Sequence, residues 1–235
     1  MSFAHPRVLF GEQEISGTSR LQAEGEKSGE VLVKKSVSTK LKNQKIMTIK
    51  EKYTPSHIAN YFLLKASKER IDDMTQMKLI KLIYIAYGWN LVFNKEQQKL
   101  FEEPILAWKH GPVIPSIYHE FKRFGGDPID DGYYSSVYEI DPENGGQVSY
   151  PIVENESPVS KILDAVWNTY KYKNGIELSR ITHESGSAWD IAHKKSLNSE
   201  LDDGDIKRRS KEKIDTIYQS IIKKSDNTNL GLANG

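Results

Sequence analysis

Residues 76–93 read QMKLIKLIYIAYGWNLVF, and apolar side chains occupy nearly every side of the helix that this segment would form. Thr75 stands directly before it and suits the N-cap position, where a side-chain oxygen accepts a hydrogen bond from the first turn. A helix that is apolar all round is buried in the core of a protein. We therefore expect residues 76–93 to form the central buried helix of the fold.

The segments on either side predict further helices. Thr54 and Pro55 are a typical N-cap and first helical residue, and Ser157 and Pro158 repeat that pattern. Apolar residues then recur at helical spacing after each start. The other expected helices lie at about 115–124, 178–183, 188–195 and 205–224.

Strand character is limited to two places. The short run 105–108 favours an extended chain and is broken by Gly111 and Pro112, and residues 132–153 place Tyr, Val and Ile on both sides of the turn-rich DPENGG. The sequence therefore predicts a mainly α fold, a single compact helical domain with a small β-hairpin or short sheet, preceded by a flexible N-terminal tail.

The two ends of the chain have a different composition. Residues 1–50 contain few apolar residues and show no sustained period, so we expect a flexible tail there. Met47 is an alternative translation start, and a genuine disordered arm is the other interpretation. The domain itself is expected at 54–224, followed by a polar C-terminal tail at 225–235.

Composition excludes several classes of protein. The 235 residues are 37% hydrophobic, carry a formal net charge of +1 and include no cysteine, which excludes disulfides and thiolate chemistry. We find neither a leader-like apolar segment nor a run long enough to cross a membrane, and expect a cytoplasmic protein without a membrane partner.

Histidine and aspartate side chains are the main candidates for chemistry. A metal site or a hydrolase would draw on His110, His119, His183, Asp190 and His193, but their spacing matches no tight metal signature. Catalysis by His183 with Asp190 as its orienting group would also need a nucleophile beside them. We favour a structural His183 that bonds to the backbone and packs on a tryptophan such as Trp189.

Phosphate and nucleic-acid chemistry have little support. The segment GGDPIDDG lacks the lysine of a phosphate-binding loop, and the basic residues between Lys207 and Lys213 have the spacing of a solvated helix face. We therefore expect neither a nucleotide cofactor nor a nucleic-acid partner.

Three blocks of sequence together resemble the Panacea domain, also called the SocA-like antitoxin domain. The blocks are MKLIKLIYIAYGWNLV, LFEEPILAWKHGPVIPSIYHEFKRFG and ELSRITHESGSAW. The residues that match the family pattern are Leu79, Lys81, Leu82, Tyr84, Ala107, Trp108, Gly111, Pro112, Val113, Tyr118, Phe121, Gly125, Leu178, Thr182, His183 and Trp189.

This resemblance implies an antitoxin that neutralises a co-encoded toxin by direct binding, without catalysis and without a cofactor or metal. It also implies a second role, as an adaptor that delivers the toxin to a Clp-type protease. A hydrolase or metal-dependent enzyme built on the histidines is the alternative.

Residues of the first two blocks divide between core and surface. We expect Tyr84, Trp108 and Phe121 to lie mainly in the core, because a helix as apolar as 76–93 needs a cover. Lys109, His110 and Tyr118 are the better candidates for contacts with a partner.

Overall fold

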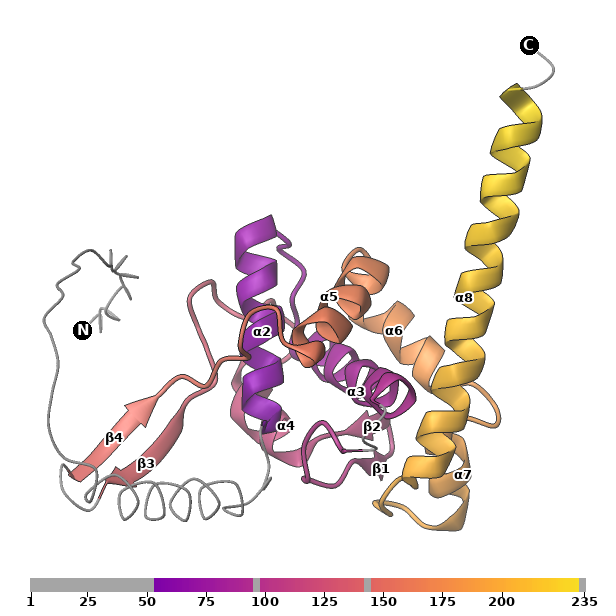
Figure 1. Cartoon of the computed structure of the whole chain (residues 1–235). Helices are drawn as coiled ribbons and strands as arrows, with labels where there is room; N and C mark the ends of the chain where they lie inside the picture. Colours follow the sequence, from indigo (N-terminus) through magenta and orange to yellow (C-terminus); the bar gives the residue numbers. More distant parts are fainter. Residues whose placement is uncertain (1–52, 95–97, 142–144, 233–235) are drawn as a thin grey trace, which may run out of the picture. The chain divides into compact units, whose positions relative to one another are not determined.

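The computed structural model describes residues 53–94, 98–141 and 145–232 (Figure 1). The chain divides into two units, Met1–Ile49 and Lys50–Gly235, and the described residues all lie in the second. The predicted tail at residues 1–50, with Met47, falls outside the described residues.

The buried helix that the sequence predicts is α3, Gln76–Phe93, which contacts α2, α5, α6 and α8 (Figure 1). It begins where predicted, with the side chain of Thr75 accepting a hydrogen bond from Lys78 N at 3.2 Å. Every residue from Lys78 to Leu91 is buried, so the polar residues of α3 must find partners inside the protein.

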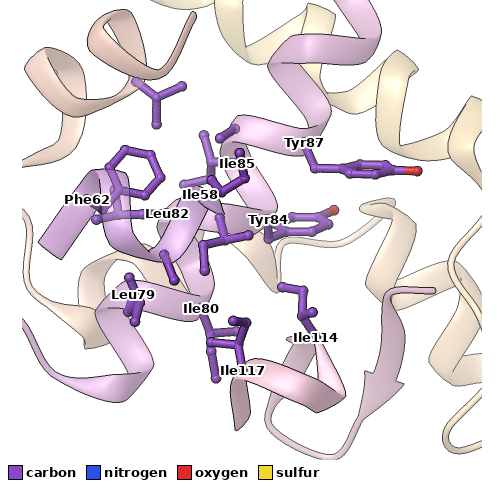
Figure 2. Close-up of a cluster of buried hydrophobic side chains, with 14 of the residues drawn as sticks. Ile58, Phe62, Leu79, Ile80, Leu82, Tyr84, Ile85, Tyr87, Ile114 and Ile117 are labelled. Atoms are coloured by element: carbon purple, nitrogen blue, oxygen red, sulfur yellow. The ribbon is translucent and has the colours of Figure 1, made fainter. Parts of the chain in front are cut away.

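Helices from both sides of α3 in the sequence supply the rest of the core. Figure 2 shows Ile58 and Phe62 from α2 and Ile117 from α4 packed around Leu79 and Leu82 of α3, and all five side chains are fully buried. The helices besides α3 are α2 (Pro55–Glu69), α4 (Pro115–Phe121), α5 (Pro158–Tyr170), α6 (Gly175–Thr182), α7 (Ala188–Lys195) and α8 (Asp203–Leu232).

Two antiparallel hairpins complete the described part of the chain. In the first, β1 (Leu106–Trp108) pairs with β2 (Gly111–Val113), and in the second, β3 (Val137–Asp141) pairs with β4 (Gly145–Ser149). The second hairpin confirms the strand prediction at 132–153, although residues 142–144 of its turn lie outside the described residues. The mainly α fold with short strands is therefore confirmed.

Two helix ends differ from the prediction. The helix expected to run to about 124 is α4 followed by a single 3-10 turn, Lys122–Phe124, which ends at Gly125. The last helix does not end near 224 but continues to Leu232, into the segment predicted as a polar tail. Once a helix has formed, each added residue gains one backbone hydrogen bond, so even polar residues prolong it.

Candidate partner-binding site

The β1–β2 hairpin presents a two-residue turn at the protein surface. Trp108 pairs with Gly111 across the hairpin, which leaves Lys109 and His110 as the turn, and both side chains are exposed. Gly111 adopts a φ of +110°, a conformation that L-residues with a side chain rarely adopt. The turn therefore requires glycine at this position.

The buried side chain of Lys81, from α3, binds the backbone of this turn. Its side chain is only 2% exposed, and its Nζ donates to the backbone carbonyls of Pro112 at 3.1 Å and His110 at 3.4 Å. Burial penalises the charged amine and lowers the pKa of Lys81 to about 7. A lysine in the middle of the core helix is thus used to bind backbone oxygens of the hairpin.

His183 meets the same turn from α6. A Cβ atom at Gly111 would lie 2.3 Å from His183 Cε1 and 2.5 Å from Lys81 Nζ, so the glycine leaves room for both side chains. His183 Nδ1 donates to Ser179 O at 2.6 Å, and the ring packs on Trp189 with 4.3 Å between ring centroids. Burial lowers the pKa of His183, and the nearby Lys81 adds to that shift. The contacts predicted for His183, a hydrogen bond to the backbone and packing on Trp189, are therefore present in the structure.

Trp189 connects α7 to the hairpin. Its Nε1 donates to Trp108 O at 2.8 Å, and its ring stacks on that of His193 with 4.7 Å between ring centroids. Lys81, Gly111, His183 and Trp189 come from three separate blocks of the sequence and converge on one turn. Hydrogen bonds from Lys81 and Trp189 hold the hairpin backbone at the carbonyl oxygens of Trp108, His110 and Pro112.

An aromatic group lies beside the turn. The rings of Trp108 and Tyr118 are 4.9 Å apart, and His119 lies 5.5 Å from Tyr118 and 6.1 Å from Trp108. Trp108 and Tyr118 are half-buried, whereas His119 is exposed. We call Trp108, Lys109, His110, Tyr118 and His119 the hairpin surface.

Most of the remaining motif residues are buried. Tyr84 and Phe121 lie in the core as expected, whereas Trp108 is only half-buried and its ring lies against those of Tyr118 and His119. The other motif residues that are buried are Leu79, Lys81, Leu82, Ala107, Gly111, Pro112, Val113, Leu178 and Thr182.

The histidines and aspartate of the enzyme alternative do not form one centre. The carboxylate of Asp190 accepts from Gly186 N at 2.9 Å and from Lys194 Nζ at 2.8 Å, while His183 is oriented by Ser179 O instead. In the part of the chain that the structure describes, no group of three His, Asp or Glu residues is placed to hold a metal ion.

Sequence reasoning did not identify two supports of the hairpin. Ala107 N donates to Ser199 O at 2.8 Å and Asn198 N donates to Ala107 O at 2.9 Å, so the segment after α7 pairs with the outer edge of β1. Glu103 binds the N and Oγ of Ser116 at 2.8 and 2.6 Å and so fixes the start of α4. Neither contact has a local signal, because each joins segments without strand or capping patterns of their own.

These features define a mainly α protein. Its core helix α3, the short helices α6 and α7, and the β1–β2 hairpin meet at one turn. Residues 79–190 match the family model described as "Antitoxin SocA-like, Panacea domain". The matched segment runs from α3 into α7 and includes all three blocks except Met77 and Lys78. The match supports a role in a toxin–antitoxin system in general.

The other comparisons add no relative. No curated protein and no solved structure gives a significant match to the chain. Among the described residues, the helices all lack the combination of length and apolar character that crossing a membrane requires.

Proposed function

We propose that this protein is the antitoxin of a toxin–antitoxin system and that it neutralises a co-encoded toxin by direct binding through the hairpin surface. The observation that carries the proposal is the convergence of the three blocks of a Panacea domain on the β1–β2 turn. In this proposal the complex forms in the cytoplasm and requires neither a cofactor nor catalysis.

The hairpin surface has the physical properties of a binding site. Trp108 and Tyr118 offer large, rigid rings that lose little conformational entropy on binding, and aromatic residues are enriched at the energetic centres of interfaces. Lys109 and His110 are exposed beside them and supply polar groups for the rim. Because Lys81, His183 and Trp189 already fix the backbone of the turn, little ordering is needed when a partner binds.

The enzyme alternative has weaker geometric support. General acid–base catalysis needs a histidine whose orienting group and substrate-facing nitrogen share an open site. Here Nδ1 of His183 donates to a carbonyl, the ring is half-buried between Gly111 and Trp189, and Asp190 is engaged with Lys194. His183 therefore has the environment of a packing residue.

Growth rescue tests the proposed function. The reading frame adjacent to the gene is expressed in bacteria with and without this protein, and co-expression should restore growth. Rescue should persist in folded His183→Ala and His110→Ala variants, since the first side chain is structural and the second is one exposed contact. Loss of rescue in a His183→Ala protein that remains folded, together with metal-dependent turnover, would favour the enzyme alternative.

Tyr118 is the expected anchor of the interface. Truncation of a half-buried tyrosine at an interface centre costs on the order of 2 kcal/mol of binding free energy, so Tyr118→Ala should weaken toxin binding about thirtyfold. Tyr172→Ala is the matched control, because Tyr172 is 80% exposed and lies between α5 and α6, outside the hairpin surface. Calorimetric titration measures both, and equal affinities for the two variants would remove Tyr118 from the interface.

Delivery of the toxin to a Clp-type protease is a second step of the proposal. If the protein acts as an adaptor, the half-life of the toxin in cells should shorten when the two are co-expressed and should recover when the protease is deleted. A half-life independent of the protease would leave neutralisation by binding alone.

A further inference from the structure

We propose that the exposed part of α8 is a second docking surface, which binds an acidic, amphipathic segment of the toxin. This inference rests on the proposed function, since it assigns the surface to the toxin. The surface consists of Ile214, Ile217, Tyr218 and Ile221, with Lys207 and Lys211 beside them, and we call it the α8 surface. It lies outside residues 79–190, the segment that matches the Panacea family.

The α8 surface continues a face of the helix that is buried at its start. Ile206, Ser210, Ile214, Ile217 and Ile221 follow one another at spacings of three and four residues, which places them on one side of an α-helix. Ile206 is 1% exposed, and Ser210 lies against Gly88 of α3. Ile214 and Ile217 are partly buried against the core, and Ile221 is 59% exposed. The same apolar face thus passes from the core into solvent.

Tyr218 widens the exposed part of this face. Its side chain is 61% exposed, and that of Ile221, on the next turn of the helix, is 59% exposed. Few other large apolar side chains among the described residues are as accessible. Apolar residues that are contiguous and exposed mark interaction sites, and tyrosine is among the residues that most often anchor an interface.

The charges around this face indicate which partner it fits. Between Ile206 and Lys223 the helix carries six basic and two acidic residues. Arg208, Arg209 and Lys213 already pair with Asp205, Glu184 and Glu212. Lys207 and Lys211 are exposed, and among the described residues neither has an ion-pair partner. Their spacing places them on the same side as Tyr218, so acidic groups of a partner would meet them there.

This charge pattern favours an acidic protein segment over the other possible occupants. A second copy of the chain would present the same two lysines at this face instead of acidic groups to pair with them. An anionic membrane surface would attract the lysines, but an interfacial helix buries its apolar face along its length, whereas the first turns of this face are already packed against α3.

The test uses the full-length protein and the product of the adjacent reading frame in calorimetric titration. Tyr218→Asp and Ile221→Asp should each weaken binding at least about tenfold, and the double variant Lys207→Glu, Lys211→Glu should weaken it about tenfold at low salt and less at high salt. Gln219→Asp is the matched control, because it adds the same charge on the opposite side of the helix and should change the affinity less than about twofold. Melting temperatures confirm that each variant is folded.

A second probe tests the surface without the toxin. It is a peptide of about 18 residues with leucine on one helical face and glutamate elsewhere. The control is the same peptide with lysine in place of each glutamate. The glutamate peptide should bind the protein, lose binding in Ile221→Asp and retain it in Gln219→Asp. Vesicles of phosphatidylglycerol and phosphatidylethanolamine should not bind.

Each outcome separates the two proposals. Toxin binding that is lost in Tyr118→Ala but unchanged in Tyr218→Asp and Ile221→Asp would overturn the α8 surface and keep the antitoxin role. Peptide binding at α8 without binding of the adjacent gene product would keep the surface and count against the antitoxin role. Failure of both probes, or binding of vesicles in place of the peptide, would overturn the inference.

Discussion

Lys81 is the residue whose chemistry the fold alters most clearly, because it is buried without a carboxylate partner among the described residues and its pKa falls to about 7. In the unfolded chain a lysine keeps its proton up to about pH 10.4. Between these values the unfolded chain binds one proton more than the native protein, so raising the pH stabilises the native state.

Lys81→Met removes this titration and keeps a long apolar side chain. From pH 7 to 9 the free energy of unfolding of the unsubstituted protein should rise, relative to that of Lys81→Met, by up to about 1.4 kcal/mol per pH unit. Urea denaturation at pH 7, 8 and 9 measures the difference. If the free energies of unfolding of the two proteins change with pH in parallel, the pKa of Lys81 is not lowered.

Gly111 is the second residue whose environment allows a sharp test. Gly111→Ala places a Cβ within 2.5 Å of two buried groups at a φ of +110°, whereas Gly132→Ala, at a φ of +82°, places one in open space. Both substitutions carry the conformational cost of a positive φ, about 1 kcal/mol, and only the first adds steric overlap. Gly111→Ala should therefore lower the free energy of unfolding by at least about 2 kcal/mol more than Gly132→Ala. Equal urea midpoints would refute the close packing of the turn.

For single residues, the sequence predicted which side chains pack in the core better than it predicted the hydrogen bonds of polar side chains. His183 on Trp189 and the burial of Tyr84 and Phe121 were predictable from residue type and helical spacing. Lys81 was recognised as part of a motif, but its contact with the hairpin carbonyls was not predictable. Helical spacing does not tell which backbone oxygens a buried amine will meet.

At the scale of helices and strands, the contact between α3 and α8 depends on Gly88. A Cβ at Gly88 would lie 2.1 Å from Ser210 Oγ and 3.2 Å from Ser210 Cβ, so the two helices approach closely here. Gly88→Ala should destabilise the protein by about 1 to 3 kcal/mol through overpacking.

A double-mutant cycle checks that the overlap lies at Ser210. Ser210→Ala removes the oxygen that the new Cβ would meet, so the combined variant should recover about 1 kcal/mol of the loss caused by Gly88→Ala. Thermal denaturation of the four proteins gives the coupling free energy. Additive effects would mean that Gly88 does not pack on Ser210.

Helix starts were predictable, whereas the pairing of β1 with a distant segment was not. Thr75 and Ser157 cap α3 and α5 as their sequence patterns predict, because the capping groups are within three residues of their partners. The pairing of β1 with residues 198–201 joins segments about ninety residues apart, and β1 itself has only three residues. Such contacts are set by the packing of α7 and α8, which no local pattern encodes.

For the molecule as a whole, the sequence predicted the class of protein but not its binding surfaces. The three blocks are separate in the chain, and their resemblance to one family was visible before the structure showed that they meet at the β1–β2 turn. The exposure of the α8 surface was not predictable, because helical spacing shows which residues share a face but not how far along that face the core extends.

Stoichiometry distinguishes an antitoxin that binds from an enzyme that acts on its target. A protein that neutralises by occupying a surface inactivates a fixed number of toxin molecules, whereas an enzyme turns over. The measurement is the residual activity of a constant amount of the adjacent gene product, titrated with this protein after short and long incubation. Activity should fall linearly to zero at a fixed molar ratio that does not change with time and is the same for His183→Ala. Complete inactivation by a small fraction of an equivalent, progressing with time and abolished in a folded His183→Ala variant, would contradict the proposed function.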